Sequence, residues 1–140
     1  MEKVVSDASI IVKWFIDEEY SDRALKLRDM HVNGEVHIVA PELMPFEVLN
    51  ALRYSGLFTV EEIKLAANSL LSYGIELYPL DMEFAEETVE IALSKDVTIY
   101  DAAYLALARK LKAVFYTADK DLIKKFGEEY AEIAIHVSRI

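Results

Sequence analysis

The chain of 140 residues contains no cysteine, only 4 glycines and only 3 prolines. Without cysteine there is neither a disulfide framework nor thiolate chemistry. The scarcity of glycine and proline leaves no linker that would divide the chain. No apolar run approaches the length that crosses a membrane, and the amino-terminal segment lacks the features of a signal peptide. We therefore expect one cytoplasmic domain spanning residues 1–140, with no membrane association.

Basic residues are also scarce, since 15 Lys and Arg stand against 25 Asp and Glu and give a net charge of −10. This balance argues against a protein that holds nucleic acid by general electrostatics, which draws on a Lys/Arg surface. It is compatible with an enzyme that contacts nucleic acid through a bound cation, or with a protein that stays bound to a basic partner. The three histidines are scattered and show no metal-ligand spacing.

What the sequence does contain is an alternation of strand and helix patterns, with enough apolar residues (54%) for a sizeable core. Short β-branched apolar runs predict strands at 3–6, 37–40, 75–78, 113–117 and 133–137. Helical spacing predicts helices at 8–17, 22–33, 41–55, 60–73, 81–94, 98–111 and 119–126. The fourth is opened by the Thr59–Glu62 capping box, and Asp81 caps the fifth. This alternation predicts a three-layer α/β/α sandwich on a five-stranded parallel sheet.

Two acids follow strands directly. Asp7 comes after the first strand and Asp119 after the fourth. Ligands of parallel α/β sheets bind outside the carboxyl ends of the strands, and a strand order of 3-2-1-4-5 would place these two acids together at the topological switch point. Each acid is equally explained as the N-cap of the helix that follows it, and Asp121 is an alternative cap for the last helix.

Two further acids lie within predicted helices. Glu47 shares a helix face with Asn50 and Tyr54, a stripe that is small and polar rather than highly charged; the alternative is the solvated side of an amphipathic helix. Asp101 fits the helix-start pattern Thr98-x-x-Asp101. Its neighbours are nevertheless almost uncharged, and an isolated acid in an apolar setting is paired, protonated or bound to a cation.

Four segments around these acids occur in a recognisable order. They are Val5-Ser6-Asp7-Ala8-Ser9, Pro41 to Leu52 with Phe46-Glu47-Val48-Leu49-Asn50, Tyr100-Asp101-Ala102-Ala103-Tyr104 to Ala108, and Tyr116-Thr117-Ala118-Asp119-Lys120-Asp121-Leu122. Together they resemble the PIN domain, and most closely its VapC-type branch of toxin ribonucleases. The resemblance covers nearly the whole chain, and four motifs at matching separations are more specific than any one of them.

The resemblance implies an RNA substrate, Mg²⁺ or Mn²⁺ as cofactor, a homodimer and a small antitoxin partner. It implies that the catalytic, metal-binding acids are Asp7, Glu47, Asp101 and Asp119, supported by Thr117, Asn50 and Asp121. Three apolar residues around the third and fourth helices are candidates for the dimer interface or for the core: Leu57, Phe58 and Tyr73.

Physical chemistry gives such a quartet a reason to bind cations. Two carboxylates ~5 Å apart at an effective dielectric of ~20 repel by roughly 3 kcal/mol, so the cluster must protonate or take up positive charge. Hard oxygen ligands favour Mg²⁺ or Mn²⁺, which lower the pKa of a bound water and offset charge at a phosphoryl group. Together with the substrate that the resemblance implies, this chemistry predicts a metal-dependent endoribonuclease, the toxin half of a toxin–antitoxin pair.

Other functions remain as alternatives. A catalytically silent PIN-like scaffold that binds RNA or protein would not need all four acids. A receiver-like signalling domain also gathers acids around Mg²⁺, but it would begin with an acidic pair, and Asp7 has no acidic neighbour. A phosphatase of the Asp-x-Asp type is disfavoured because position 9 is serine.

Overall fold

A parallel sheet of five strands forms the centre of the molecule in a computed structural model that describes residues 2–140. The strands are β1 (Glu2–Ser6), β2 (Val36–Pro41), β3 (Glu76–Tyr78), β4 (Val114–Thr117) and β5 (Ala134–His136). Their order is β3-β2-β1-β4-β5, and every neighbouring pair is parallel. The predicted strand order is confirmed, and β1 and β4 are neighbours.

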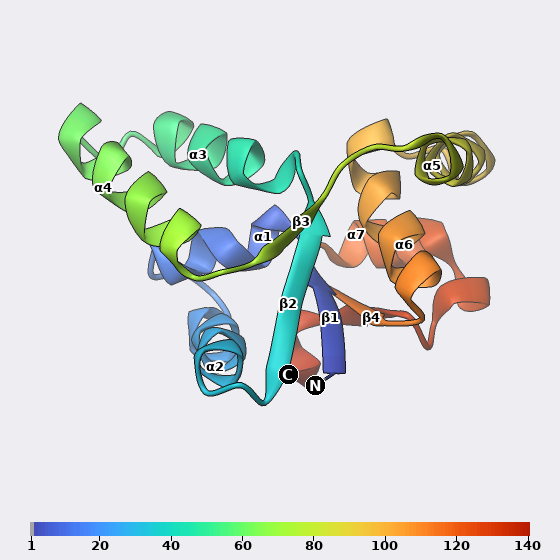
Figure 1. Cartoon of the computed structure of the whole chain (residues 1–140), viewed down its shortest axis with the longest axis horizontal. Coiled ribbons are helices and arrows are strands. Elements are labelled where there is room, and N and C mark those ends of the chain that lie inside the picture. Colours follow the sequence, from blue (N-terminus) through green and yellow to red (C-terminus); the bar gives the residue numbers. More distant parts are fainter. Residues whose placement is uncertain (1) are drawn as a thin grey trace.

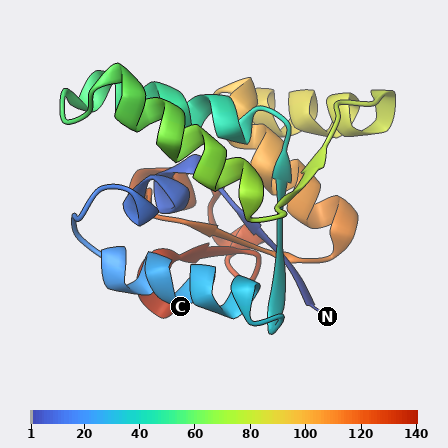
Figure 2. The same ribbon diagram turned by 60° about the vertical axis from the view of Figure 1, so that its left-hand side comes forward.

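Helices cover both faces of the sheet. They are α1 (Ala8–Ile11), α2 (Ser21–Val32), α3 (Met44–Ser55), α4 (Val60–Ser72), α5 (Met82–Lys95), α6 (Ile99–Leu111) and α7 (Lys120–Phe126). Short 3₁₀ turns occupy Val12–Trp14, Glu128–Tyr130 and Val137–Arg139. Figure 1 shows α1 to α4 on one side of the sheet and α5 to α7 on the other, as the predicted three-layer sandwich requires. In Figure 2, α4 lies along α3, with α2 below them.

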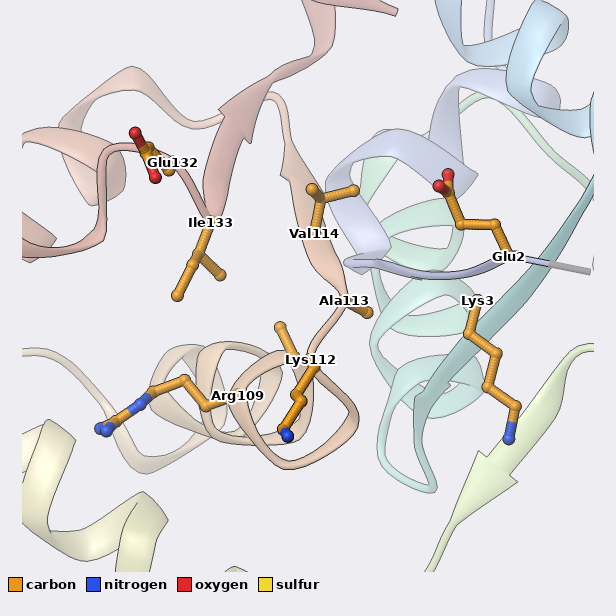
Figure 3. A pocket seen from close by; sticks show the side chains of 9 residues that line it. Glu2, Lys3, Arg109, Lys112, Ala113, Val114, Glu132 and Ile133 are labelled. Atoms are coloured by element: carbon orange, nitrogen blue, oxygen red, sulfur yellow. The ribbon is translucent and has the colours of Figure 1, made fainter.

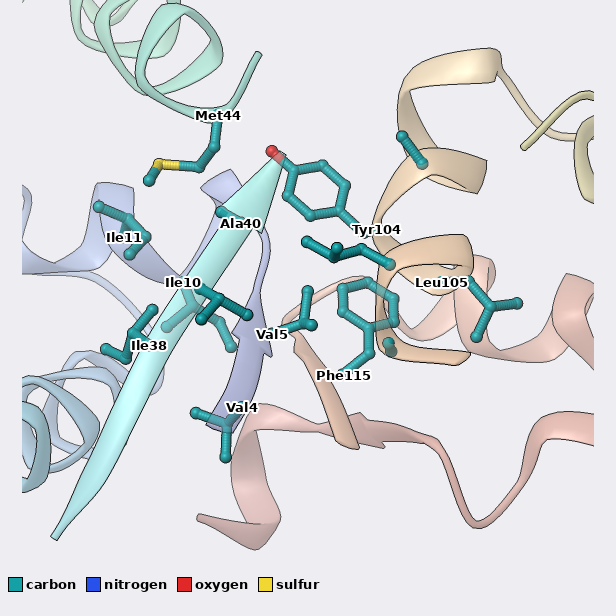
Figure 4. Packing of buried hydrophobic residues seen from close by; sticks show 14 of the residues in the cluster. Val4, Val5, Ile10, Ile11, Ile38, Ala40, Met44, Tyr104, Leu105 and Phe115 are labelled. Atoms are coloured by element: carbon teal, nitrogen blue, oxygen red, sulfur yellow. The ribbon is translucent and has the colours of Figure 1, made fainter. Parts of the chain in front are cut away.

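The core is densest where α6 crosses the middle of the sheet. Every residue from Ala102 to Ala108 is buried, and α6 packs against β1, β2 and β4. Its alanines let the helix backbone approach the strands closely, while Tyr104 stacks on Phe115 of β4 with ring centroids 5.9 Å apart. Figure 4 shows these rings beside the buried side chains of β1 and β2. The central strands are buried on both faces, as is usual in parallel sheets.

Several predicted helix ends are confirmed in atomic detail. The Thr59 hydroxyl accepts a hydrogen bond from the Glu62 N–H, and the Glu62 carboxylate accepts one from the Thr59 N–H, which completes the capping box. Asp81 accepts from the Phe84 N–H and caps α5. Gly56 ends α3 at φ 74°, a left-handed conformation that glycine adopts without strain. No helix among residues 2–140 is both long and apolar enough to span a bilayer.

Two local predictions were wrong. The first helix was expected over 8–17, but α1 ends at Ile11 and a 3₁₀ turn follows. The chain instead turns into a loop held by Ser21, whose hydroxyl accepts from the Glu18 N–H and donates to the Ile16 carbonyl. Pro41 was expected to start the third helix, but it is the last residue of β2, because the buried strand continues through it before α3 begins.

Candidate active site

The four predicted acids come from four elements that converge at the carboxyl end of the sheet. Asp7 follows β1, Asp119 follows β4, Glu47 lies on α3 and Asp101 lies in the first turn of α6. The Asp7 N–H donates to the Tyr116 carbonyl at 3.2 Å, so the contact between β1 and β4 continues beyond the end of β1. The switch point between these strands is therefore where the sequence predicted it.

Asp7 is the most buried of the four acids, with 7% of its surface exposed. Its Oδ1 accepts hydrogen bonds from both the backbone N–H and the hydroxyl of Ser9, so it also caps α1. The Ser9 hydroxyl in turn accepts from the Ala118 N–H at 3.0 Å, which ties α1 to the loop after β4. Burial raises the pKa of Asp7 to about 7, against the opposing hydrogen bonds from Ser9.

Asp101 connects the acids electrostatically. Burial and then the charge of Asp119 raise the pKa of Asp101, while the Lys125 ammonium opposes them. The Asp101 charge in turn raises the pKa of both Asp7 and Glu47. Asp101 therefore lies within electrostatic reach of each of the other three acids. The helix-start interpretation of this turn is also correct, because the Thr98 hydroxyl accepts from the Asp101 N–H.

Glu47 is held by a residue that the sequence did not identify. The Tyr104 hydroxyl on α6 donates a hydrogen bond to Glu47 Oε1 at 2.6 Å. Burial raises the pKa of Glu47, and the Tyr104 hydrogen bond works in the opposite direction. Burial and the carboxylates of Glu47 and Asp7 raise the pKa of Tyr104 strongly, so the phenol stays protonated and able to donate. The available signal was spacing, since Tyr104 lies one turn after Asp101 on the same helix face.

Asp119, the last of the four acids, lines two pockets. Asp119 is exposed, caps α7 through the Leu122 N–H, and donates its own N–H to the buried Thr117 hydroxyl at 3.1 Å. Asp119 and Asp121 both line a pocket of about 380 Å³ that contains Asp101 and Lys125. Both also line a second pocket of about 410 Å³, whose other lining residues include Lys13, Tyr20, Lys120 and His136. Asn50 is exposed on α3, one turn from Glu47.

The donor atoms of these residues suit a hard cation. All four side chains offer carboxylate oxygens, and the pKa of three of them is raised, first by burial and then by the charge of a neighbouring acid. Within residues 2–140, no three His, Cys, Asp or Glu side chains form a group close enough to hold a metal by themselves. Mg²⁺ commonly keeps several of its waters in protein sites, so one or two direct carboxylate contacts are enough.

A further pocket lies elsewhere. It measures about 450 Å³ and is formed at the amino ends of β1 and β4 and the carboxyl end of α6. Figure 3 shows side chains of both signs around it, among them Lys3, Lys112, Glu2 and Glu132. Its position at the opposite end of the strands from the four acids separates it from the candidate site.

Comparison with known proteins shows the family of this chain. Residues 4–128 match the model of the PIN domain family. The chain is 32% identical over 129 residues to Ribonuclease VapC3 of Pyrobaculum aerophilum, covering 89% of this chain and 95% of that protein. The chain therefore belongs to the PIN-domain family, in its VapC-type branch.

Solved structures share the fold at lower identity. VapC20 of Mycobacterium tuberculosis, described as a sarcin-ricin loop cleaving toxin, superposes with a TM-score of 0.69 at 16% identity, covering 86% of this chain and 93% of that one. A toxin–antitoxin complex from Klebsiella pneumoniae gives a TM-score of 0.64 at 15% identity, covering 96% and 97%.

The raised pKa of Asp7 predicts how stability depends on pH without metal. A pKa of about 7 means that the folded protein binds this proton more tightly than the unfolded chain does. The resulting stabilisation is full below about pH 4 and is lost as the pH rises through 7. The Asp7→Asn variant has no charge at position 7 at any pH, so it does not lose stability in this way as the pH rises. We expect the melting temperature of the variant, relative to the parent, to rise by several degrees between about pH 4.5 and pH 8. A difference that stays constant over that range would contradict the burial of an ionisable Asp7.

Asp101 and Thr98 form a matched pair for separating charge repulsion from helix capping. Thr98→Ala removes the acceptor of the Asp101 N–H and should lower the unfolding free energy by about 1 kcal/mol. Asp101→Asn removes like-charge repulsion, so the metal-free variant should be at least as stable as the parent. Added Mg²⁺ should stabilise the parent more than Asp101→Asn. Thermal melts would refute the site if Asp101→Asn melted lower without metal and gained the same increment from Mg²⁺.

Proposed function

We propose that this chain is an Mg²⁺- or Mn²⁺-dependent endoribonuclease and the toxin component of a toxin–antitoxin pair. The observation that carries the proposal is the placement of four carboxylates at the carboxyl end of the sheet, around the switch point between β1 and β4, with Asp101 within electrostatic reach of the other three. The relatives named above, a ribonuclease and two toxin structures, support the same class of activity.

The roles of the acids follow from their surroundings. Asp7, Glu47, Asp101 and Asp119 would hold the cation, with Thr117, Asn50 and Asp121 in support. A bound cation supplies a water of lowered pKa and offsets negative charge at the phosphoryl group under attack. Burial raises the pKa of Asp7 to about 7, and a cation bound beside it would lower that pKa and favour the ionised carboxylate. Cleavage would leave a 5′-phosphate and a 3′-hydroxyl.

The pocket beside Asp119 offers a place for the RNA backbone. Lys13 and Lys120 both line it. Lys13 is already paired with Glu18 at 3.1 Å, whereas Lys120 makes no ion pair within the part of the chain that is described. In a chain of net charge −10, phosphate contact therefore depends on the bound cation together with a few local lysines such as Lys120.

An apolar hollow supports a protein partner. It measures about 340 Å³ and lies between α3 and α4, next to Glu42 and close in sequence to Glu47. Phe46 and Leu71 line it and are 77% and 68% exposed. Exposed apolar patches of this kind mark interaction sites. We assign this hollow to an apolar segment of the antitoxin, which would then lie beside the active site.

A homodimer would use a different surface. Of the residues proposed from sequence, Leu57 is exposed, but Phe58 and Tyr73 pack against the core, Tyr73 edge-on to Trp14. A separate set of exposed apolar residues lies on α5 and the start of α6, where Leu93 is 76% exposed and Tyr100 is also exposed. We propose that this surface forms the dimer interface.

The catalytic prediction is tested with purified protein and RNA. Cleavage should require Mg²⁺ or Mn²⁺ and stop in excess chelator. Asp7→Asn and Glu47→Gln should each lower the rate roughly 100-fold or more, while Glu86→Gln, which alters an exposed acid of α5, should leave it unchanged. A catalytically silent scaffold would bind RNA without cutting it. Cleavage that persists in chelator, with contaminating nucleases excluded, would refute the metal-dependent mechanism.

The dimer prediction is tested by light scattering. The parent should have twice the mass of one chain, and Leu93→Glu should reduce it to a single chain because a charge would be buried in the interface. Leu57→Glu, at an apolar position of the α3–α4 turn that is 65% exposed, should remain dimeric. A parent mass of one chain across a wide concentration range would rule out the dimer.

A further inference from the structure

Tyr104 joins the two helices that carry acids of the candidate site. Its hydroxyl donates to Glu47 Oε1 at 2.6 Å, across 57 residues of sequence. Asp101 lies one turn earlier on the same helix, so a single face of α6 presents both an acid and a donor to a second acid.

The core fixes the position of the Tyr104 hydroxyl. The side chain is only 1% exposed, and its ring stacks on Phe115 at an interplanar angle of 12°. Figure 4 shows the ring lying above Phe115 with its oxygen directed away from the core, toward the end of the sheet where Met44 begins α3. A ring held in this way leaves the oxygen little freedom to move.

Glu47 has no comparable support of its own. Its helix presents exposed side chains on either side of it, Phe46 and Asn50. Glu47 is a flexible side chain, and in water it would sample several rotamers. The hydrogen bond occupies Oε1 and leaves Oε2 available to a cation or to a water bound to one.

We propose that Tyr104 is the positioning residue for Glu47, fixing one carboxylate oxygen so that the other faces Asp7 and Asp101 at the site. The proposal rests on the proposed function, because it assigns Glu47 to cation binding. Tyr104 itself touches neither cation nor RNA. Its contribution is to hold a ligand in place before the cation arrives, and the partners that orient metal ligands typically contribute 10- to 100-fold in affinity.

The test is Tyr104→Phe, which removes one oxygen and keeps the stacked ring. Titration calorimetry with Mn²⁺ should show affinity weakened by about tenfold relative to the parent. RNA cleavage at saturating Mn²⁺ should recover a large part of the parental rate, because excess metal offsets the weaker site. Tyr130→Phe, which removes the hydroxyl of another buried tyrosine that accepts from Arg109 at the far end of α6, serves as the matched control and should leave both measurements unchanged.

A double-mutant cycle separates positioning from general support of the fold. In a Glu47→Gln background the carboxylate is already lost, so adding Tyr104→Phe should not weaken Mn²⁺ binding further. If Tyr104→Phe lowers the melting temperature but binds Mn²⁺ as the parent does, the residue is only structural and the inference is overturned. Additive losses of affinity in the double variant would also overturn it.

Two further experimental outcomes are separate from those of the double-mutant cycle. A parent protein that binds no Mn²⁺ refutes the proposed function itself. If Tyr104→Phe fails to fold, Glu47→Asp provides the same test, because the shorter side chain draws the carboxylate away from an intact phenol. Glu47→Asp should then lose Mn²⁺ affinity, and full retention of affinity would overturn the inference.

Discussion

Repulsion among carboxylates at one end of the sheet is the constraint on which the site depends. Asp7 is buried and its pKa rises to about 7, and the charge of Asp101 raises the pKa of both Asp7 and Glu47. Few groups near these carboxylates lower their pKa values, chiefly the Lys125 ammonium and a set of hydrogen-bond donors. Such a cluster is stable when protonated or when it holds a cation. The proposed enzyme uses this deficit of positive charge to bind the ion that its chemistry requires.

The topology of the sheet brings these charged residues to one end of the molecule. The order β3-β2-β1-β4-β5 places the ends of β1 and β4 side by side, so Asp7 and Asp119 follow neighbouring strands although more than a hundred residues separate them. The alanine-rich α6 then lies close to the central strands and brings Asp101 and Tyr104 to the same edge. Apolar packing in the core fixes the position of α6, and it therefore also determines where the polar groups of this helix lie.

Much of this arrangement was predictable from sequence because the signals are local. Strand order followed from the alternation of elements and the family resemblance, and the caps at Thr59 and Asp81 followed from residue type at a defined spacing. The predicted helix over 8–17 was wrong because a tertiary contact, the Ser21 hydroxyl in the following loop, overrode the local pattern. The bond between Tyr104 and Glu47 was missed because a tyrosine within an apolar helix is typical of a core residue. Its partner becomes visible only when α3 and α6 are placed together.

The most direct test of the account is a crystal structure of the protein soaked with Mn²⁺, with anomalous diffraction used to locate the ion. The account predicts a peak among the carboxylates of Asp7, Glu47, Asp101 and Asp119, with Tyr104 still bonded to Glu47. A protein that binds Mn²⁺ in solution but shows its peak elsewhere, or shows none at this end of the sheet, would contradict it.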